Sequence, residues 1–246
     1  MGKFQEALAD FARVIVLNEN YMQARLGLGR TYRVMREYEK SLAEFNQAIN
    51  LGEEDVWAYG GRGETYRMMG RYEEALADFN TAIALDEKLD WAIGDRGRVY
   101  LALGQYEEAL ADFSRTIVLN KRYSLYRYYQ ALAYLGLHNQ RDFVEVLSIA
   151  IELAQSALFE EPDGLSASFD LALMKLVSGD IQAESEYEQI IALCRSLPHL
   201  QYALDDLDDY LKLQPANQFA QRVRSKLQTS IVELSSSSAN DSSHLS

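Results

Sequence analysis

Apolar side chains recur three or four residues apart along residues 38–49. This spacing places them on one face of an α-helix and leaves the polar residues between them on the opposite face. The same stripe returns at residues 72–83, 34 residues further along the chain. In its first copy the stripe consists of Tyr38, Ser41, Leu42, Phe45, Ala48 and Ile49.

The repeat extends well beyond these two helices. Segments of closely similar sequence occupy residues 2–11, 36–45, 70–79 and 104–113, at a constant step of 34 residues. Between them lies a second recurring segment, at residues 28–32, 62–66 and 96–100, with a looser copy at 130–134. Each period therefore contains two helical segments, which is the signature of a repeat built from helix pairs.

Glycine stands inside each of the earlier helices, at Gly29, Gly63 and Gly97. A glycine in a helix interior costs about 1 kcal/mol, so its use here predicts close packing, where a missing Cβ lets the second helix approach. Arg62 and Arg96 precede two of these glycines on the inward stripe, where an unpaired cation would be costly. We expect each to pair with the acidic residue that precedes the aromatic of a second helix. These acidic residues are Asp10, Glu44, Asp78 and Asp112.

The pattern resembles the tetratricopeptide repeat family. The residues that carry the resemblance are the small residues Gly29, Gly63, Gly97 and Ala131, the aromatics three positions later, the small residues Ala7, Ser41, Ala75 and Ala109, and the aromatics Phe11, Phe45, Phe79 and Phe113. The match covers residues 2 to about 153. It departs from the family at the proline that often ends a repeat, where Glu19, Glu53, Glu87 and Lys121 stand instead. The resemblance implies an all-α fold, a right-handed superhelical solenoid of helix pairs with a divergent C-terminal helical extension.

Three regions are expected on this basis. Residues 1–161 form the array, a half repeat followed by about four repeats, with the last helix running from Asn139 to Phe159. Residues 162–234 hold degenerate repeat-like helices at 165–177 and 181–193 and two further helices that cap the stack, and the serine-rich residues 235–246 are expected to be disordered. The N-terminal half repeat leaves the stripe of Phe4, Ala7, Leu8 and Phe11 without its own first helix. Either the chain is a segment of a longer protein or another chain covers this stripe, for example by self-association.

Composition narrows the function further. The chain has 24 basic and 37 acidic residues, a net charge of −13, which disfavours binding to nucleic acid or to an anionic membrane. The single Cys194 excludes an internal disulfide and is expected in the core, and the chain is read as a cytoplasmic protein of bacterial type. The three histidines are far apart, and the four carboxylates of residues 205–209 are expected on a solvated helix face. No catalytic motif is found, so we expect no enzyme, no metal and no cofactor.

A second stripe on the first helices is separate from the packing stripe. In the family the first helices line a concave groove that binds peptides, and this resemblance makes the second stripe the candidate site. Its residues are Gln23, Arg30, Arg33, Trp57, Glu64, Arg67, Trp91, Arg98 and Tyr128. The four arginines make the groove locally basic, so the expected ligand is an extended peptide with acidic and aromatic or apolar residues. The sequence leaves open whether the two tryptophans lie in the groove or in the core.

The leading functional hypothesis is a scaffold or adaptor that binds a protein segment in the groove. Some family members clamp the C-terminal carboxylate of chaperones with Lys and Asn, but the corresponding positions here carry Leu26, Arg30, Gly61, Trp91 and Asp95. The alternative hypothesis is a regulatory or sensor module of a larger signalling protein, similar to arrays attached to STAND-type ATPases, with the catalytic part outside this chain. An RNA-binding repeat is disfavoured by the acidic charge.

Overall fold

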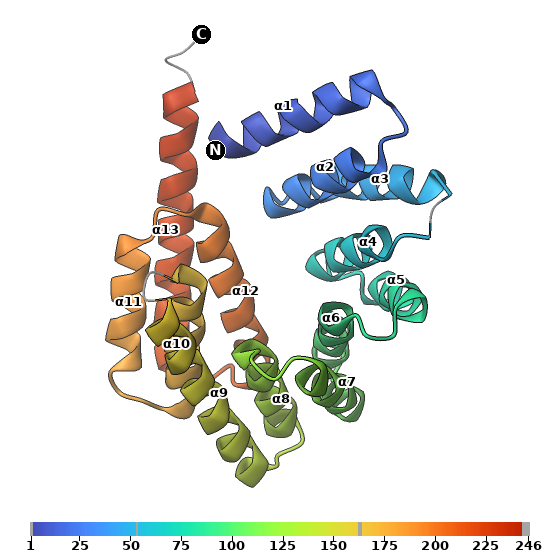
Figure 1. The fold of residues 1–246 in the computed structure, drawn as a ribbon. Coiled ribbons are helices and arrows are strands. Elements are labelled where there is room, and N and C mark those ends of the chain that lie inside the picture. The colour runs from blue at the N-terminus through green and yellow to red at the C-terminus, as the bar shows by residue number, and fades with distance from the viewer. Residues whose placement is uncertain (1, 53, 162–163, 243–246) are drawn as a thin grey trace. The chain divides into compact units, whose positions relative to one another are not determined.

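The computed structural model describes residues 2–52, 54–161 and 164–242, with side chains at 4–52, 54–161 and 164–236. These residues form thirteen α-helices and no strand (Figure 1), which confirms the all-α prediction. The helices are α1 Gly2–Leu17, α2 Met22–Val34, α3 Tyr38–Asn50, α4 Val56–Met68, α5 Tyr72–Leu85, α6 Asp90–Ala102, α7 Tyr106–Leu119, α8 Ser124–Gly136, α9 Gln140–Glu160, α10 Leu165–Ser178, α11 Ala183–Leu193, α12 Leu197–Leu213 and α13 Gln218–Ser242.

The chain divides into two compact units, residues 1–119 and 120–246. The first contains α1 to α7 and the second α8 to α13. The predicted boundary lay later, after residue 161. The structure groups α8 and α9 with the later helices because α9 packs against α10 as well as against α8.

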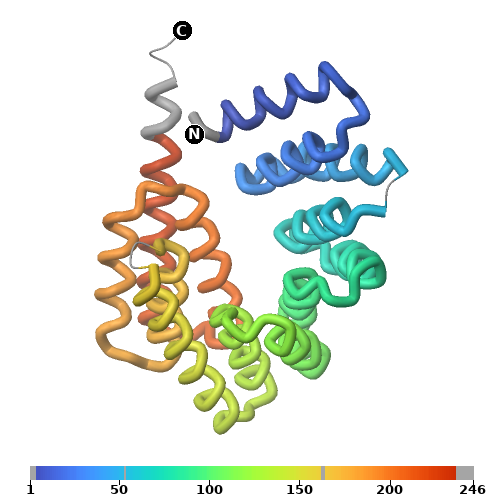
Figure 2. Tube along the Cα trace, viewed as in Figure 1, coloured from blue at the N-terminus to red at the C-terminus, as the bar shows by residue number. Residues whose placement is uncertain are grey.

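In the first unit the helices pack as pairs, α2 with α3, α4 with α5 and α6 with α7. Each second helix also contacts the first helix of the next pair, α3 with α4 and α5 with α6. The first helices α2, α4 and α6 lie in one row and the second helices α3, α5 and α7 in another (Figures 1 and 2). This is the stacking expected of a helical repeat solenoid.

The glycines inside the first helices provide the predicted close contacts. An added Cβ at Gly29 would stand 2.9 Å from Phe45 Cζ, and one at Gly97 would stand 2.8 Å from Phe113 Cε1. Phe45 also lies against the next pair, where an added Cβ at Gly61 would stand 2.5 Å from its ring. Phe45 and Phe113 are completely buried as a result. The glycines therefore offset their helix cost by admitting a whole aromatic ring.

The predicted ion pairs are also present. Arg62 of α4 donates from Nε and Nη2 to Asp78 of α5, at 2.7 and 2.6 Å, and from Nη1 to Asn46 of α3 at 2.6 Å. Arg96 of α6 repeats the arrangement one pair later with Asp112 and Asn80. Each arginine thus joins its own second helix to the preceding one and fixes their register.

The second unit contains three helix pairs. Its α9, α10 and α11 lie within two residues of the predicted helices, and Cys194 is buried at the end of α11 as expected. The helix α13 continues to Ser242, into the segment that the sequence predicts to be disordered. The prediction of disorder for residues 243–246 lies outside the described residues.

One prediction for this unit is wrong. Asp206 does not lie on a solvated face: it is buried, and it accepts a hydrogen bond from the hydroxyl of Tyr129. The reason is that α12 packs against α8, which turns one of the four neighbouring carboxylates inward. Its neighbours Asp208 and Asp209 pair instead with Arg224 and Lys212.

Candidate binding face

The predicted site residues come from four first helices. Gln23, Arg30 and Arg33 lie on α2, Trp57, Glu64 and Arg67 on α4, Trp91 and Arg98 on α6, and Tyr128 on α8. The first three helices belong to one unit and form the row that we call the first-helix face. Tyr128 belongs to the other unit and is completely buried. It is therefore not exposed for contact with a ligand, whereas Gln23 and Arg30 are exposed.

Five charged residues of the first-helix face form a cluster, consisting of Arg33, Glu64, Arg67, Asp95 and Arg98. Arg67 donates two hydrogen bonds to the Glu64 carboxylate, at 2.7 and 2.9 Å. Arg98 Nη1 lies 3.9 Å from Asp95 Oδ1, a longer and weaker pair. Only about a tenth of each of the Glu64, Arg67 and Arg98 side chains is exposed, so these charges act on one another with little screening by water.

The pKa values of the two carboxyl groups of the cluster are shifted in opposite directions. Burial alone would raise the pKa of Glu64, but the charges of Arg67, Arg33 and Arg98 and the hydrogen bonds from Arg67 lower it to about 2. Burial and the nearby Glu64 charge raise the pKa of Asp95 to about 7, against the pull of the same arginines. The arginines therefore stabilise one carboxylate fully and the other only in part.

Arg33 is the least satisfied member of the cluster. Its buried Nε has no hydrogen-bond partner among the described residues. Its charge nevertheless lowers the pKa values of Glu64 and Asp95, so it lies within electrostatic reach of both. The three arginines outnumber the two carboxylates, which leaves positive charge on this face of an acidic protein.

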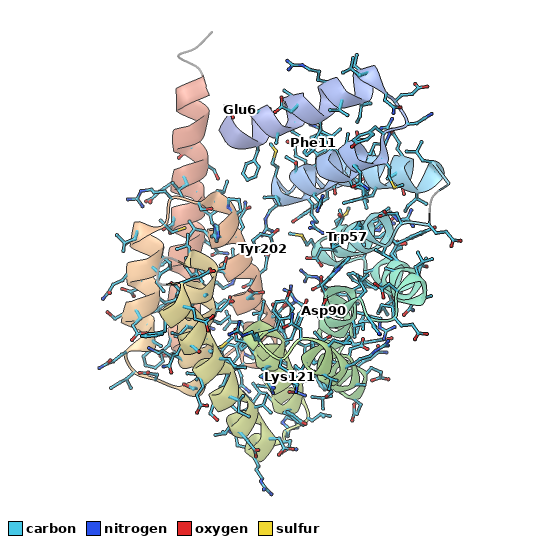
Figure 3. All side chains as sticks on the ribbon, viewed as in Figure 1. Glu6, Phe11, Trp57, Asp90, Lys121 and Tyr202 are labelled. Carbon is cyan, nitrogen blue, oxygen red and sulfur yellow. The ribbon has the colours of Figure 1, made fainter. Side chains whose placement is uncertain are left out.

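The two tryptophans stack on each other across α4 and α6, with ring centroids 5.1 Å apart and planes inclined by 14°. Trp57 is 48% exposed and lies on α4 (Figure 3), while Trp91 is half-buried. An added Cβ at Gly60 would stand 2.1 Å from Trp91 Cη2, so Trp91 fills the space that this glycine leaves. This space is therefore occupied by the protein's own side chain. Trp91 supports the more exposed ring of Trp57.

Asp95 stands on the second stripe that the sequence predicts, but it is not among the candidate site residues. Its position corresponds, at the 34-residue step, to the packing glycines Gly27 and Gly61. An acidic residue in place of a packing glycine was the available signal, but its pairing with arginines of neighbouring helices could not be read from the repeat.

Within the described residues, no group of three or more His, Cys, Asp or Glu side chains could hold a metal ion. Of the helices described, none combines the length and the apolar character required to cross a membrane.

Sequence comparison supplies the family. Models of the tetratricopeptide repeat match residues 56–89 and, in a second variant, residues 1–54 and 95–141, together more than half of the chain. The chain belongs to the tetratricopeptide repeat family. Members of this family are protein-interaction scaffolds, and this tetratricopeptide repeat protein is assigned to that broad class. A search of curated proteins found no significant match.

Solved structures agree on the fold. A structure of MamA has 22% sequence identity and a TM-score of 0.57, over 63% of this chain and 91% of that one. A tetratricopeptide repeat protein from Parabacteroides merdae ATCC 43184 has 16% identity and a TM-score of 0.57, over 92% of this chain and 93% of that one. At these identities the likeness concerns the helical repeat fold alone.

Proposed function

We propose that the first-helix face of residues 1–119 binds a segment of another protein that carries a carboxylate next to an aromatic or apolar side chain. The observation that carries the proposal is the excess of arginine in the charged cluster on the same face of the molecule as the half-exposed Trp57. Of the residues predicted from the sequence, Gln23, Arg30, Arg33, Trp57, Arg67 and Arg98 remain candidates for contact.

The carboxylate of the ligand pairs with Arg33. The guanidinium of Arg67 is committed to Glu64 through two short hydrogen bonds, and Arg98 lies near Asp95. Arg33 alone in the cluster takes part in no ion pair among the described residues. A guanidinium held in a partly dehydrated site can bind a carboxylate in a fork geometry that a lysine cannot match.

Trp57 supplies the apolar half of the site. Nearly half of this large ring is exposed, and its stack on Trp91 holds it in place, so little conformational entropy is lost when a ligand covers it. Tryptophan is a favoured anchor at protein interfaces for this reason. A carboxylate and an apolar group on one peptide would engage Arg33 and Trp57 together.

Binding of a carboxylate should depend on pH through Asp95. A ligand carboxylate near the cluster repels ionised Asp95, so binding favours the protonated form and raises the pKa of Asp95 above its value of about 7. The affinity should therefore be higher below pH 7 and decrease as pH rises through that value. A ligand in which an amide replaces the carboxylate should not show this dependence.

The test measures binding of fluorescein-labelled peptides by anisotropy. Each peptide carries Asp or Glu beside Phe or Leu, and its matched partner carries Asn or Gln in place of the acid. We expect the acidic member to bind about tenfold more tightly or better, since a charge-assisted hydrogen bond contributes roughly 1.5–3 kcal/mol. Arg33→Gln should remove this preference, and Trp57→Ala should weaken both members of a pair.

The matched control is Arg71→Gln, which removes one exposed arginine from the second-helix row, where it pairs with Glu74. It should leave binding unchanged. Equal losses in the Arg33 and Arg71 variants would reduce the effect to overall charge, and acidic and amide peptides of equal affinity would refute the proposed site.

A regulatory or sensor role within a larger signalling protein remains a prediction from the sequence. So do a cytoplasmic location, a bacterial origin, and the absence of catalysis and of nucleic-acid or membrane binding.

A further inference from the structure

Helix α12 departs from the regular stacking of the helix pairs. In the earlier pairs the second helix packs against the following first helix, as α3 does with α4, α5 with α6 and α9 with α10. After α11 this place is taken by α13, which packs against α11 and pairs with it through Arg222–Glu184 and Lys226–Glu188. Helix α12 packs against α8 and α10 (Figure 1), the first helices of the two preceding pairs.

The side of α8 that α12 covers is the side that carries the predicted site in the earlier repeats. Tyr129 stands, at the 34-residue step, in the register of Asp95 of α6. Tyr129 and its neighbour Tyr128 are completely buried, and the Tyr129 hydroxyl donates a hydrogen bond to the Asp206 carboxylate of α12. Burial and, next, the charge of Asp206 raise the pKa of the Tyr128 hydroxyl, so this carboxylate lies close to both tyrosines. In the second unit, therefore, α12 occupies the place on a first helix that the proposed ligand takes in the first unit.

The occupant is an amphipathic helix with one acid in its apolar stripe. Its buried residues follow one another at a spacing of three, with one adjacent pair, and a single member of the set is charged. They are Leu200, Ala203, Asp206, Leu207 and Tyr210. The carboxylate is followed directly by a leucine, and one helical turn later by an aromatic ring. This is the combination of groups that the proposed ligand carries, here presented by a helix.

We propose that the ligand of the first-helix face in residues 1–119 is an amphipathic helix of the α12 pattern, contributed by another protein, rather than an extended peptide. The inference rests on the proposed function and adds the conformation of the ligand and the spacing of its groups. The acid of this helix meets the charged cluster, because Asp95 stands at the level of the first helices at which Tyr129 meets Asp206. Arg33 then binds the ligand carboxylate as the Tyr129 hydroxyl binds Asp206.

The chemistry of the face also favours a helix. An extended peptide leaves its backbone N–H and C=O groups in need of partners, whereas a helix pairs them internally. The backbone groups in the middle of α2, α4 and α6 are already paired within these helices, and Gln23 supplies the only side-chain amide among the predicted site residues. A helical ligand requires side-chain contacts alone, of the kind that Asp206 makes on α8.

Peptides copied from α12 provide the test. The probe is a fluorescein-labelled peptide of residues 197–213, and its binding to the full chain is measured by anisotropy. Asp205 lies outside the buried stripe, so two peptides that differ only there form a matched pair: Asp205→Ala favours the helix and Asp205→Pro breaks it. We expect the Asp205→Ala peptide to bind at least about tenfold more tightly than the Asp205→Pro peptide.

Two further substitutions locate the contact. In the Asp205→Ala peptide, Asp206→Asn should weaken binding by about tenfold, since it removes a charge-assisted hydrogen bond, and Arg33→Gln in the protein should remove that difference. Asp208→Asn in the same peptide is the control. It removes a carboxylate from outside the buried stripe and should leave the affinity unchanged.

The outcomes separate this inference from the proposed function. If the alanine and proline peptides bind equally, or if neither binds while short acidic peptides do, the ligand is not a helix and the inference fails although the site stands. If no acidic peptide binds more tightly than its amide partner, the proposed function fails as well. Binding that Arg33→Gln leaves unchanged would place the peptide on α8, in exchange for α12, and would overturn the inference.

Discussion

At the scale of single residues, the charged cluster combines two carboxyl groups whose pKa values have moved apart. Three arginines are close enough to hold Glu64 ionised, yet Asp95 is raised from 3.8 to about 7 by burial and by the Glu64 charge. Because the pKa values of these two groups differ between the folded and the unfolded chain, their protonation contributes to the free energy of folding. The cluster therefore makes the stability of residues 1–119 sensitive to pH near neutrality.

The variant Asp95→Asn tests this. Between about pH 4 and pH 7 the folded protein binds more protons at Asp95 than the unfolded chain does, so this residue makes the free energy of unfolding decrease as pH rises. Asparagine resembles the neutral acid and does not titrate. We expect the variant to be more stable than the wild type at pH 8, by on the order of 2 kcal/mol, and nearly equal to it at pH 4.

Urea unfolding followed by tryptophan fluorescence at pH 4 to 8 measures the effect. Glu73→Gln, which removes an exposed carboxylate of α5, is the control and should follow the wild-type profile. Parallel profiles for the wild type and the Asp95 variant would contradict the assignment.

At the scale of elements, the turn from first to second helix imposes one backbone conformation on four repeats. Arg36, Gly70, Gly104 and His138 occupy the same position of the repeat, and all have positive φ angles, of 58°, 73°, 74° and 57°. Glycine adopts this left-handed conformation without steric cost, whereas side chains with a Cβ do so at a penalty. Two of the four turns therefore carry strain that the other two avoid.

Reciprocal substitutions should expose this strain. His138→Gly is expected to raise the free energy of unfolding by about 1 kcal/mol, and Gly70→Ala to lower it by about the same amount. Thermal unfolding of both variants beside the wild type provides the measurement. A destabilised His138→Gly variant would show that the imidazole contributes more to the turn than its backbone strain costs.

At the scale of the whole molecule, the two units carry separate natural probes. Trp57 and Trp91 are the only tryptophans and lie in residues 1–119, while the only cysteine, the buried Cys194, lies in residues 120–246. Because helix repeats contact mainly their neighbours, stability in such arrays is a sum of local terms. The two units can then unfold at different denaturant concentrations.

We expect two transitions on titration with urea. Tryptophan fluorescence should report the unfolding of the first unit, and the reaction of Cys194 with a thiol reagent that of the second. Different midpoints would establish independent cooperative units. If the tryptophan and thiol midpoints coincide in the wild type and also in the Asp95→Asn variant, the chain unfolds as one body.

The repeat could be predicted from the sequence because the interactions that define it act between residues at fixed, short separations along the chain. The helix pairs, the glycines against Phe45 and Phe113, and the pairing of Arg62 with Asp78 all follow from a 34-residue period in which each residue meets a partner at a fixed offset. Close packing and buried charge leave few residue types acceptable at such positions. Even the divergent α10 and α11 kept enough periodicity to be predicted.

Only part of the candidate site could be predicted from the sequence. Its stripe of residues could be read from the spacing, but whether each side chain is free or occupied depends on how neighbouring helices are rotated and how closely they approach. That geometry alone placed Trp91 over Gly60, buried Tyr128 and Asp206, and brought Asp95 beside Glu64 among three arginines. The sequence by itself determined which helices form and how they pair, because those interactions act within one repeat. Only the tertiary structure decided which charges and rings remain available, because burial and electrostatic coupling are set jointly by side chains from several repeats.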